Sequence, residues 1–179
     1  MRIHVPANFS LRSVDDKDHS WLIELHNDPA VLYNMHDPRP ITRERHMSWW
    51  DGVVTDPQQE RLIFYSNEEK VGFAGFRFDY INKSCVLGAN IHKSFRGQGL
   101  AKYMWALMLN RCFDYHMLHR VSLLTAEYNE IGKRLYTNLG FKEEGRQVQS
   151  LRRDNEFYDC ISMYMLKNDW SVEHDAPAK

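Results

Sequence analysis

The sequence predicts a mixed α/β fold, a single domain with one central sheet that is part antiparallel and part parallel. Three expected strands follow one another directly, at residues 61–65, 71–80 and 84–92, and such a run favours antiparallel pairing. A further strand, at 119–126, stands between two helical segments, which indicates a parallel connection. We therefore expect six to seven strands flanked by about four helices.

The N-terminal part begins with a short strand over residues 9–14. Asp15-Asp16 supplies side chains that cap the helix that follows, whose apolar residues share one face. Asp28-Pro29 ends or kinks this helix, because the residue before a proline avoids the helical conformation. Thr42 has the character of an N-cap and predicts a second helix over residues 43–54.

The C-terminal half alternates helices and strands. A helix with apolar residues on most sides is usually well buried, and the segment 103–115 has this character. Gly140 is a typical C-terminal cap for a short helix just before it. The expected elements are helices over 103–115 and 130–139, and strands over 119–126, 141–149 and 157–166, the last two joined by a polar turn at 152–155.

The chain has 179 residues, and we assign 1–170 to one domain and 171–179 to a polar tail. A formal net charge of −1 provides no global field for nucleic acid. No apolar run approaches the roughly 20 residues of a membrane span, and the N-terminus lacks the apolar core of a secretion signal. We expect a cytoplasmic protein that binds neither nucleic acid nor membrane.

The three cysteines, Cys85, Cys112 and Cys160, lie far apart and have no metal-ligand spacing. An odd number of distant cysteines is typical of reduced thiols in the cytosol. Each is expected to serve as a small buried apolar residue. The sequence therefore predicts no metal site.

A glycine turn at residues 96–101, Arg-Gly-Gln-Gly-Leu-Ala, joins an expected strand to an expected helix. Glycines tolerate positive φ and lack the Cβ atoms that would block a ligand. Because the first helical turn has free N–H groups and the positive end of the dipole, the turn is expected to bind a phosphate or pyrophosphate. Neither the P-loop nor the dinucleotide fingerprint fits, and a purely structural turn is the alternative on this motif alone.

A second motif follows at residues 129–141, with the pattern N-x-x-G-x-x-x-Y-x-x-x-G-F. With the R-x-x-G-x-A turn before it, the chain resembles the GCN5-related N-acetyltransferases over residues 71–166. The most similar branch contains the amino-sugar, ribosomal-protein-alanine and spermidine acetyltransferases. The resemblance implies the acyl-CoA N-acyltransferase fold and acetyl-CoA as the co-substrate.

The resemblance also implies how acetyl-CoA binds. Its pyrophosphate would meet the N–H groups of the glycine turn, and the guanidinium of Arg96 adds a donor fork. The backbone around Asn90 and Ile91 would bind the pantetheine arm like an added strand, and Asn129 would contact that arm or a water, besides capping a helix. The expected cofactor-binding residues are Asn90, Ile91, Arg96, Gly97, Gln98, Gly99, Leu100, Ala101, Asn129 and Lys133.

Tyr136 is the residue expected to perform chemistry. A neutral amine attacks a thioester, and the leaving thiolate has a reference pKa of about 8.5 by analogy with cysteine. A phenol of pKa about 10 can protonate it at little cost. The alternative is a tyrosine that only packs in the core.

The general base is left open. Many relatives carry a glutamate on the strand before the turn, whereas residues 86–91 here hold no acid. The candidates are Glu127, just before Asn129, and His92, whose type titrates near neutrality. For both, a solvated or capping side chain is the alternative, and a water chain without one dominant base is a third possibility.

The N-terminal half resembles the amino-sugar branch, which acts on nucleotide-linked 4-amino sugars, although Leu32 departs from its usual arginine. Arginine binds phosphate oxygens in a fork, so three arginines there could meet a diphosphate or form a solvated helix face. Trp49 and Trp50 could stack on the acceptor or pack in the core. The similar residues are Asn27, Pro29, Val31, Met35, Ile41, His46 and Trp49, and the arginines are Arg39, Arg43 and Arg45.

We therefore expect transfer of acetyl to the primary amine of a small molecule, with a nucleotide-linked 4-amino sugar favoured. Polyamine and protein N-terminal acetylation are the alternatives; the first would want an acidic cluster and the second an open groove. A non-catalytic acyl-CoA-binding module would have no need of Tyr136. The resemblance also allows a homodimer that pairs through the last two strands.

Overall fold

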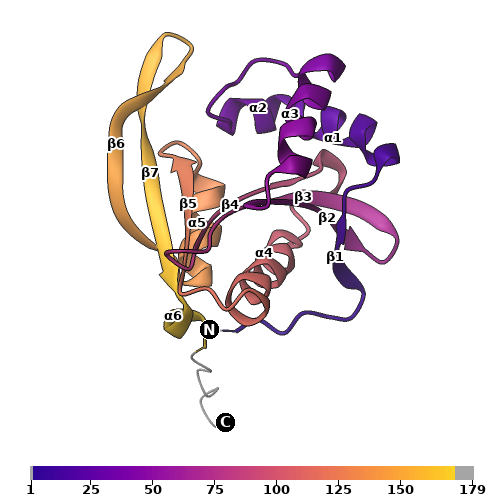
Figure 1. Ribbon diagram of the computed structural model, residues 1–179. Coiled ribbons are helices and arrows are strands. Elements are labelled where there is room, and N and C mark those ends of the chain that lie inside the picture. The colour runs from indigo at the N-terminus through magenta and orange to yellow at the C-terminus, as the bar shows by residue number, and fades with distance from the viewer. Residues whose placement is uncertain (1, 172–179) are drawn as a thin grey trace.

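The computed structural model describes residues 2–171 as one seven-stranded sheet with helices on both faces (Figure 1). The sheet order is β1-β2-β3-β4-β5-β7-β6, and β4 and β5 are the parallel pair among antiparallel neighbours. The mixed α/β prediction is confirmed. The strands are β1 (Phe9–Ser13), β2 (Gln59–Ser66), β3 (Glu69–Asp79), β4 (Ser84–Ile91), β5 (Arg120–Ala126), β6 (Lys142–Arg153) and β7 (Glu156–Leu166).

Two groups of helices cover the two faces of the sheet (Figure 1). The N-terminal helices lie over one face, and α4 and α5 lie over the other. The C-terminal α6 closes the end of the core beneath α4, where the buried Trp170 donates from its indole to the Oδ1 of Asn110 at 2.9 Å. The helices are α1 (His19–His26), α2 (Pro29–Asn34), α3 (Arg43–Thr55), α4 (Ala101–Asn110), α5 (Glu130–Leu139) and α6 (Lys167–Ser171).

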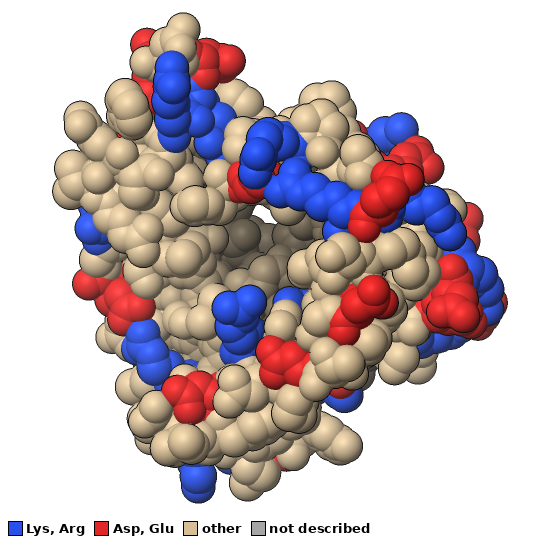
Figure 2. All heavy atoms as spheres, turned by 45° about the horizontal axis from the view of Figure 1, so that its top comes forward, with Lys and Arg blue, Asp and Glu red and all other residues tan. Residues whose placement is uncertain are grey.

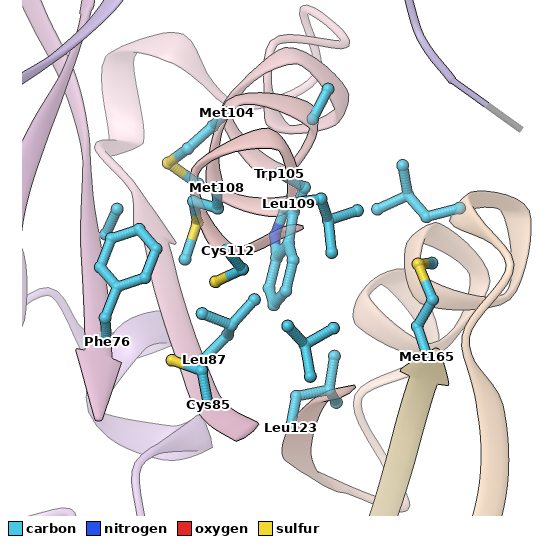
Figure 3. Packing of buried hydrophobic residues seen from close by; sticks show 14 of the residues in the cluster. Phe76, Cys85, Leu87, Met104, Trp105, Met108, Leu109, Cys112, Leu123 and Met165 are labelled. Atoms are coloured by element: carbon cyan, nitrogen blue, oxygen red, sulfur yellow. The ribbon is translucent and has the colours of Figure 1, made fainter. Parts of the chain in front are cut away.

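The main hydrophobic core lies between the sheet and α4. Figure 3 shows Trp105 and Met108 of α4 packed among side chains of the strands, including Phe76 and Leu87. A smaller core under α1 joins Leu22 to the opposite face of the sheet. Burial of this apolar surface, at about 25 cal/mol per Å², holds both helical layers against the strands.

Local capping chemistry places the helices largely where the sequence predicts. Thr42 accepts from the amide of Arg45 at 3.2 Å and begins α3. Gly140 ends α5 with φ of +99°, a conformation that favours glycine. Asp28 ends α1 as expected, but it also N-caps a further short helix, α2, which was not predicted. At the first position of a helix a backbone N–H has no partner within the helix, so the proline there loses no hydrogen bond. A second helix can therefore begin at Pro29, directly after α1 ends.

The C-terminal hairpin is longer than expected. Its strands extend to Arg153 and from Glu156, so that only Asp154 and Asn155 form the turn. Both have positive φ, +47° and +69°, as the tight two-residue hairpin turn requires. The expected helix over 103–115 begins earlier, with α4, and finishes as a π-helical turn over Arg111–Tyr115.

Strands β4 and β5 part soon after they meet. Their paired residues are Ser84–Val86 with Arg120–Ser122, although β4 continues to Ile91 and β5 to Ala126. Beyond Val86, β4 keeps β3 as its partner on one side and has no strand partner on the β5 side within the described residues. The sheet therefore opens along the edge that leads to the glycine turn.

Cys85, Cys112 and Cys160 are free and buried, as expected. Within residues 2–171, no helix is both long and apolar enough to span a bilayer. Residues 172–179 of the expected polar tail lie outside the described part of the chain.

Candidate active site

A cavity of about 660 Å³ occupies the opening between β4 and β5. Its walls come from both helical layers: α1 and α3 contribute His26 and Trp49, and α4 and α5 contribute Trp105 and Tyr136. The cavity thus passes through the plane of the sheet. Figure 2 shows the hollow, with Lys and Arg side chains gathered at its rim.

The glycine turn has the geometry of an anion site. Gly97 and Gly99 have φ of +77° and +71°, and a Cβ built on either would meet no heavy atom within 4 Å. The space above both glycines is therefore open. No backbone acceptor within the described residues takes the amides of residues 97–100, and α4 begins directly after them. Both features fit a pyrophosphate.

The guanidinium of Arg96 makes contacts within the protein. Its guanidinium donates to the carbonyl of Ile91 at 3.1 Å and to Oδ1 of Asp28 at 2.8 Å. Asp28 also accepts from the amides of Ala30 and Val31. Arg96 therefore ties the glycine turn to the start of α2, a structural role that the sequence did not suggest.

Asn90 and Ile91 lie on the part of β4 that faces the opening. They pair with Phe73 and Gly72 of β3, and the β5 side of their backbone has no strand partner in the described chain. Unpaired strand backbone can take an extended ligand as an added strand. This arrangement fits the amide groups of a pantetheine arm.

The asparagine and the first glycine of the second motif depend on each other. Asn129 accepts from the amide of Gly132 at 3.0 Å and donates to Oγ1 of Thr125 at 3.1 Å. A Cβ on Gly132 would come within 2.4 Å of the Asn129 side-chain nitrogen. Asn129 is therefore the cap of α5 as well as a residue of the cavity wall, and only glycine at 132 leaves room for it.

Tyr136 lies where α5 meets the cavity. Its ring packs edge-on against Trp105, with centroids 4.9 Å apart, and against Phe141. Burial raises the pKa of Tyr136 to about 12, above the value of 10 expected from the sequence. Its hydroxyl is therefore protonated at neutral pH and is available as a donor.

Glu127 and His92, the candidate bases, and Lys133, expected to bind the cofactor, lie outside the cavity wall. Glu127 accepts from the amide of Asp159 at 2.9 Å and so holds β5 to β7. His92 accepts from the amide of Ser94 at 3.3 Å and stacks on Trp21. Lys133 donates to Glu130 at 2.7 Å on the exposed side of α5. The structure therefore gathers Tyr136, Asn129 and Asn90 around the cavity, but not these three.

The N-terminal residue string shapes the other half of the cavity. Asn27 donates to the carbonyl of Ile41 at 2.8 Å and accepts from its amide at 2.7 Å, which fixes the loop before α3. Met35, His46 and Trp49 of the string line the cavity. Trp50, in contrast, packs edge-on against His19. One tryptophan faces the cavity and the other packs beside it.

The arginines predicted to face a ligand divide in the same way. Arg39 and Arg45 line the cavity, whereas Arg43 does not. Sequence reasoning missed Arg61 of β2, Arg77 of β3 and His26 of α1, which also line it. The available signal was strand alternation, since Arg61 and Arg77 occupy positions that face the N-terminal helices along with Phe73.

Contacts beside the cavity hold α2 against the C-terminal hairpin. The buried Arg153, at the end of β6, donates to the carbonyls of Tyr33, within α2, and of Met35, directly after it. The hydroxyl of Tyr128 also donates to the Tyr33 carbonyl, at 2.6 Å. The hairpin and the loop before α5 thus hold α2 and Met35, a residue of the cavity wall, in place.

Comparison with known proteins gives one family and several relatives. Residues 19–141 match the acetyltransferase (GNAT) family. An uncharacterized prophage N-acetyltransferase of Bacillus subtilis, YokL, is 24% identical over 93% of this chain and 94% of its own length. The spermidine N(1)-acetyltransferase of Vibrio cholerae is 22% identical over 92% and 96%.

Solved structures of spermidine N-acetyltransferase from Vibrio cholerae share the fold. A complex with CoA and spermine matches with a TM-score of 0.86 at 21% identity, and covers 92% of this chain and 99% of that one. A dodecameric form matches with a TM-score of 0.79 at 20% identity, over 93% and 98%. At this identity the likeness concerns the fold.

The Asn129–Gly132 pair gives a stability prediction. Gly132→Ala gains helix propensity of about 1 kcal/mol, but it displaces the Asn129 cap and overpacks the turn, so we expect a net loss of about 1–3 kcal/mol. Gly52→Ala in α3 is the matched control, because nothing lies within 4 Å of its Cβ, and it should stabilise. Urea unfolding measures both, and equal effects would refute the clash.

His26 gives a pH prediction. Burial, with His46 and Arg61 nearby, lowers the pKa of His26 from 6.5 to about 4. As the pH falls, His26 in the unfolded chain takes up its proton near pH 6.5, whereas in the folded protein it does so only near pH 4. The free energy of unfolding should therefore fall by about 3 kcal/mol as the pH drops from 6.5 to 4. In His26→Phe this slope should be smaller, and in the exposed control His36→Phe it should persist. An unchanged slope in His26→Phe contradicts the account.

Proposed function

The chain belongs to the acetyltransferase (GNAT) family, and on this premise we propose that it transfers acetyl from acetyl-CoA to the primary amine of a small molecule by direct attack. The observation that carries the proposal is a cavity that joins the unpaired edge of β4 to Tyr136 and to the N-terminal helices. A donor from one face and an acceptor from the other can meet only in such an opening.

Acetyl-CoA, when bound, would supply an acetyl group activated as a thioester. The glycine turn and the start of α4 would hold its pyrophosphate, and Asn90 and Ile91 would hold its pantetheine arm. The open space at Gly97 and Gly99 and the free amides beside them support this assignment. Arg96 would support the site through Asp28 rather than act alone.

Tyr136 holds a proton at its hydroxyl oxygen and would give it to the departing thiolate. Its pKa of about 12 lies above that of a thiol in water, so the transfer depends on the surroundings. The same dry wall of Trp105 and Phe141 would raise the pKa of a thiolate beside it. The pKa of the departing thiol is thereby brought closer to that of Tyr136.

The acceptor arrives mostly as an ammonium and must lose a proton before attack. Glu127 and His92 have protein partners of their own and do not line the cavity. We therefore favour the water-chain alternative, in which water within the cavity carries the proton to solvent.

The relatives and the residue pattern of the N-terminal half favour different acceptors. The sequence favours a nucleotide-linked amino sugar, with a polyamine as the alternative. The relatives from Vibrio cholerae are spermidine acetyltransferases, and they support the polyamine alternative better. The dodecameric relative likewise supports an oligomer, of which the expected homodimer would be a part.

We expect Tyr136→Phe to lower kcat by about 100-fold or more, the usual contribution of a positioned acid, with little change in acetyl-CoA affinity. Release of free thiol from acetyl-CoA, measured with spermidine, ethanolamine and lysine as acceptors, tests turnover, and calorimetry tests affinity. Tyr115→Phe removes an exposed hydroxyl outside the cavity and is the control. Full turnover in Tyr136→Phe would rule out the acid role, and absence of thiol release with every amine would count against the proposed function.

A further inference from the structure

We propose that the acceptor carries an anionic group, a carboxylate or a phosphate, and that Arg61 and Arg77 bind this group beside the reacting amine. The inference rests on the proposed acetyl transfer and names the acceptor class that the cavity selects. It departs from the polyamine class, because a polyamine is purely cationic.

The charge of the cavity wall is the first observation. Four arginines line it, Arg39, Arg45, Arg61 and Arg77, against a single carboxylate, Asp37. Asp37 already accepts from Arg39 at 2.7 Å and from Arg45 at 2.5 Å. These contacts hold the pKa of Asp37 well below its usual range. The lone carboxylate is thus occupied, and positive charge is in excess.

Arg61 is a fixed cation that forms no ion pair within the described residues. The carboxylate of Asp56 attracts both Arg61 and Arg77 at longer range, but it accepts from Gln58 and Gln59 and does not line the cavity. Its guanidinium donates to the carbonyls of Phe76 at 2.6 Å and Glu60 at 2.8 Å, and to Oε1 of Gln59 at 2.5 Å. Its Cζ lies 5.7 Å from the centre of the Trp49 ring. These neutral partners fix the guanidinium without cancelling its charge, and its Nε–H remains available to a ligand.

Arg77 stands beside Arg61 on the same face of the sheet. Arg61 pairs with Gly75, and Arg77 lies two residues further along β3, where alternate residues share a face. Its side chain is exposed and has no hydrogen bond or ion pair within residues 2–171. Burial, followed by the charge of Arg77, lowers the pKa of Arg61. Asp56 offsets part of this repulsion from outside the cavity wall, and an anion between the two guanidinium groups would relieve it further.

The position of this pair fits an acceptor rather than a cofactor. Arg77 pairs with Val86, the last residue of β4 before the strands part. The pair lies on the face covered by α1 and α3, whereas Tyr136 comes from the opposite helical layer. An amine in the opening could therefore reach towards Tyr136 while its anionic group stays on the arginines.

The test uses acceptors that differ by one anionic group. Lysine is compared with 1,5-diaminopentane, and phosphoethanolamine with ethanolamine, and spermidine is a third arm. Thiol release should give a kcat/KM about tenfold or more higher for the anionic member of at least one pair, the usual effect of a charged hydrogen bond. The pair with the larger difference in kcat/KM shows whether the site prefers a carboxylate or a phosphate.

Variants at the exposed Arg77 test the assignment with little risk to folding. Arg77→Gln should abolish the preference for the anionic acceptor, mainly by raising its KM. Arg77→Lys should restore part of this preference, and Arg77→Glu should favour the acceptor that lacks the anionic group. Arg12→Gln removes the same charge from the edge strand β1 and should leave the preference unchanged.

A wild-type preference for spermidine or 1,5-diaminopentane would overturn the inference and leave the acetyl transfer intact. If no amine supports thiol release, the proposed function fails, and calorimetric titration with phosphoethanolamine and lysine still decides the inference. Binding that Arg77→Gln weakens about tenfold supports the anion site, and binding that Arg77→Gln leaves unchanged, or no binding at all, overturns it.

Discussion

The parting of β4 from β5 is the constraint on which the site depends. Paired parallel strands would use their backbone groups on each other, and their side chains would close the space between them. Here pairing stops at Val86 and Ser122, so β4 keeps a free edge up to the glycine turn. The same opening lets the cavity reach both helical layers, and the proposed transfer would bring donor and acceptor together there.

The local geometry of the glycine turn and of the second motif could be predicted from the sequence, because it depends on neighbouring residues. A positive φ at Gly97 and Gly99, a cap at Asn129 and a close approach at Gly132 each depend on residues within one turn. Spacing alone can express such constraints. The mixed sheet was predicted for a similar reason, since the hydrophobic pattern and the order of elements limit the topology.

The cavity wall on the side of the N-terminal helices was predicted less well, because it depends on tertiary contacts. Arg61 and Arg77 come from different strands, and only the β2–β3 register brings them together. Arg96 has the right type for phosphate, but Asp28, 68 residues away, takes part of its hydrogen bonding. Glu127 likewise finds its partner on β7. These partners lie far away in the sequence, so a short sequence motif cannot predict them.

Amide hydrogen exchange, with and without CoA, tests most directly whether the opening between β4 and β5 is the cofactor site. The account predicts that CoA protects the amides of residues 97–102 and those of residues 87–91 that face β5, more than any other segment. Protection elsewhere, or none in these segments at saturating CoA, would contradict it.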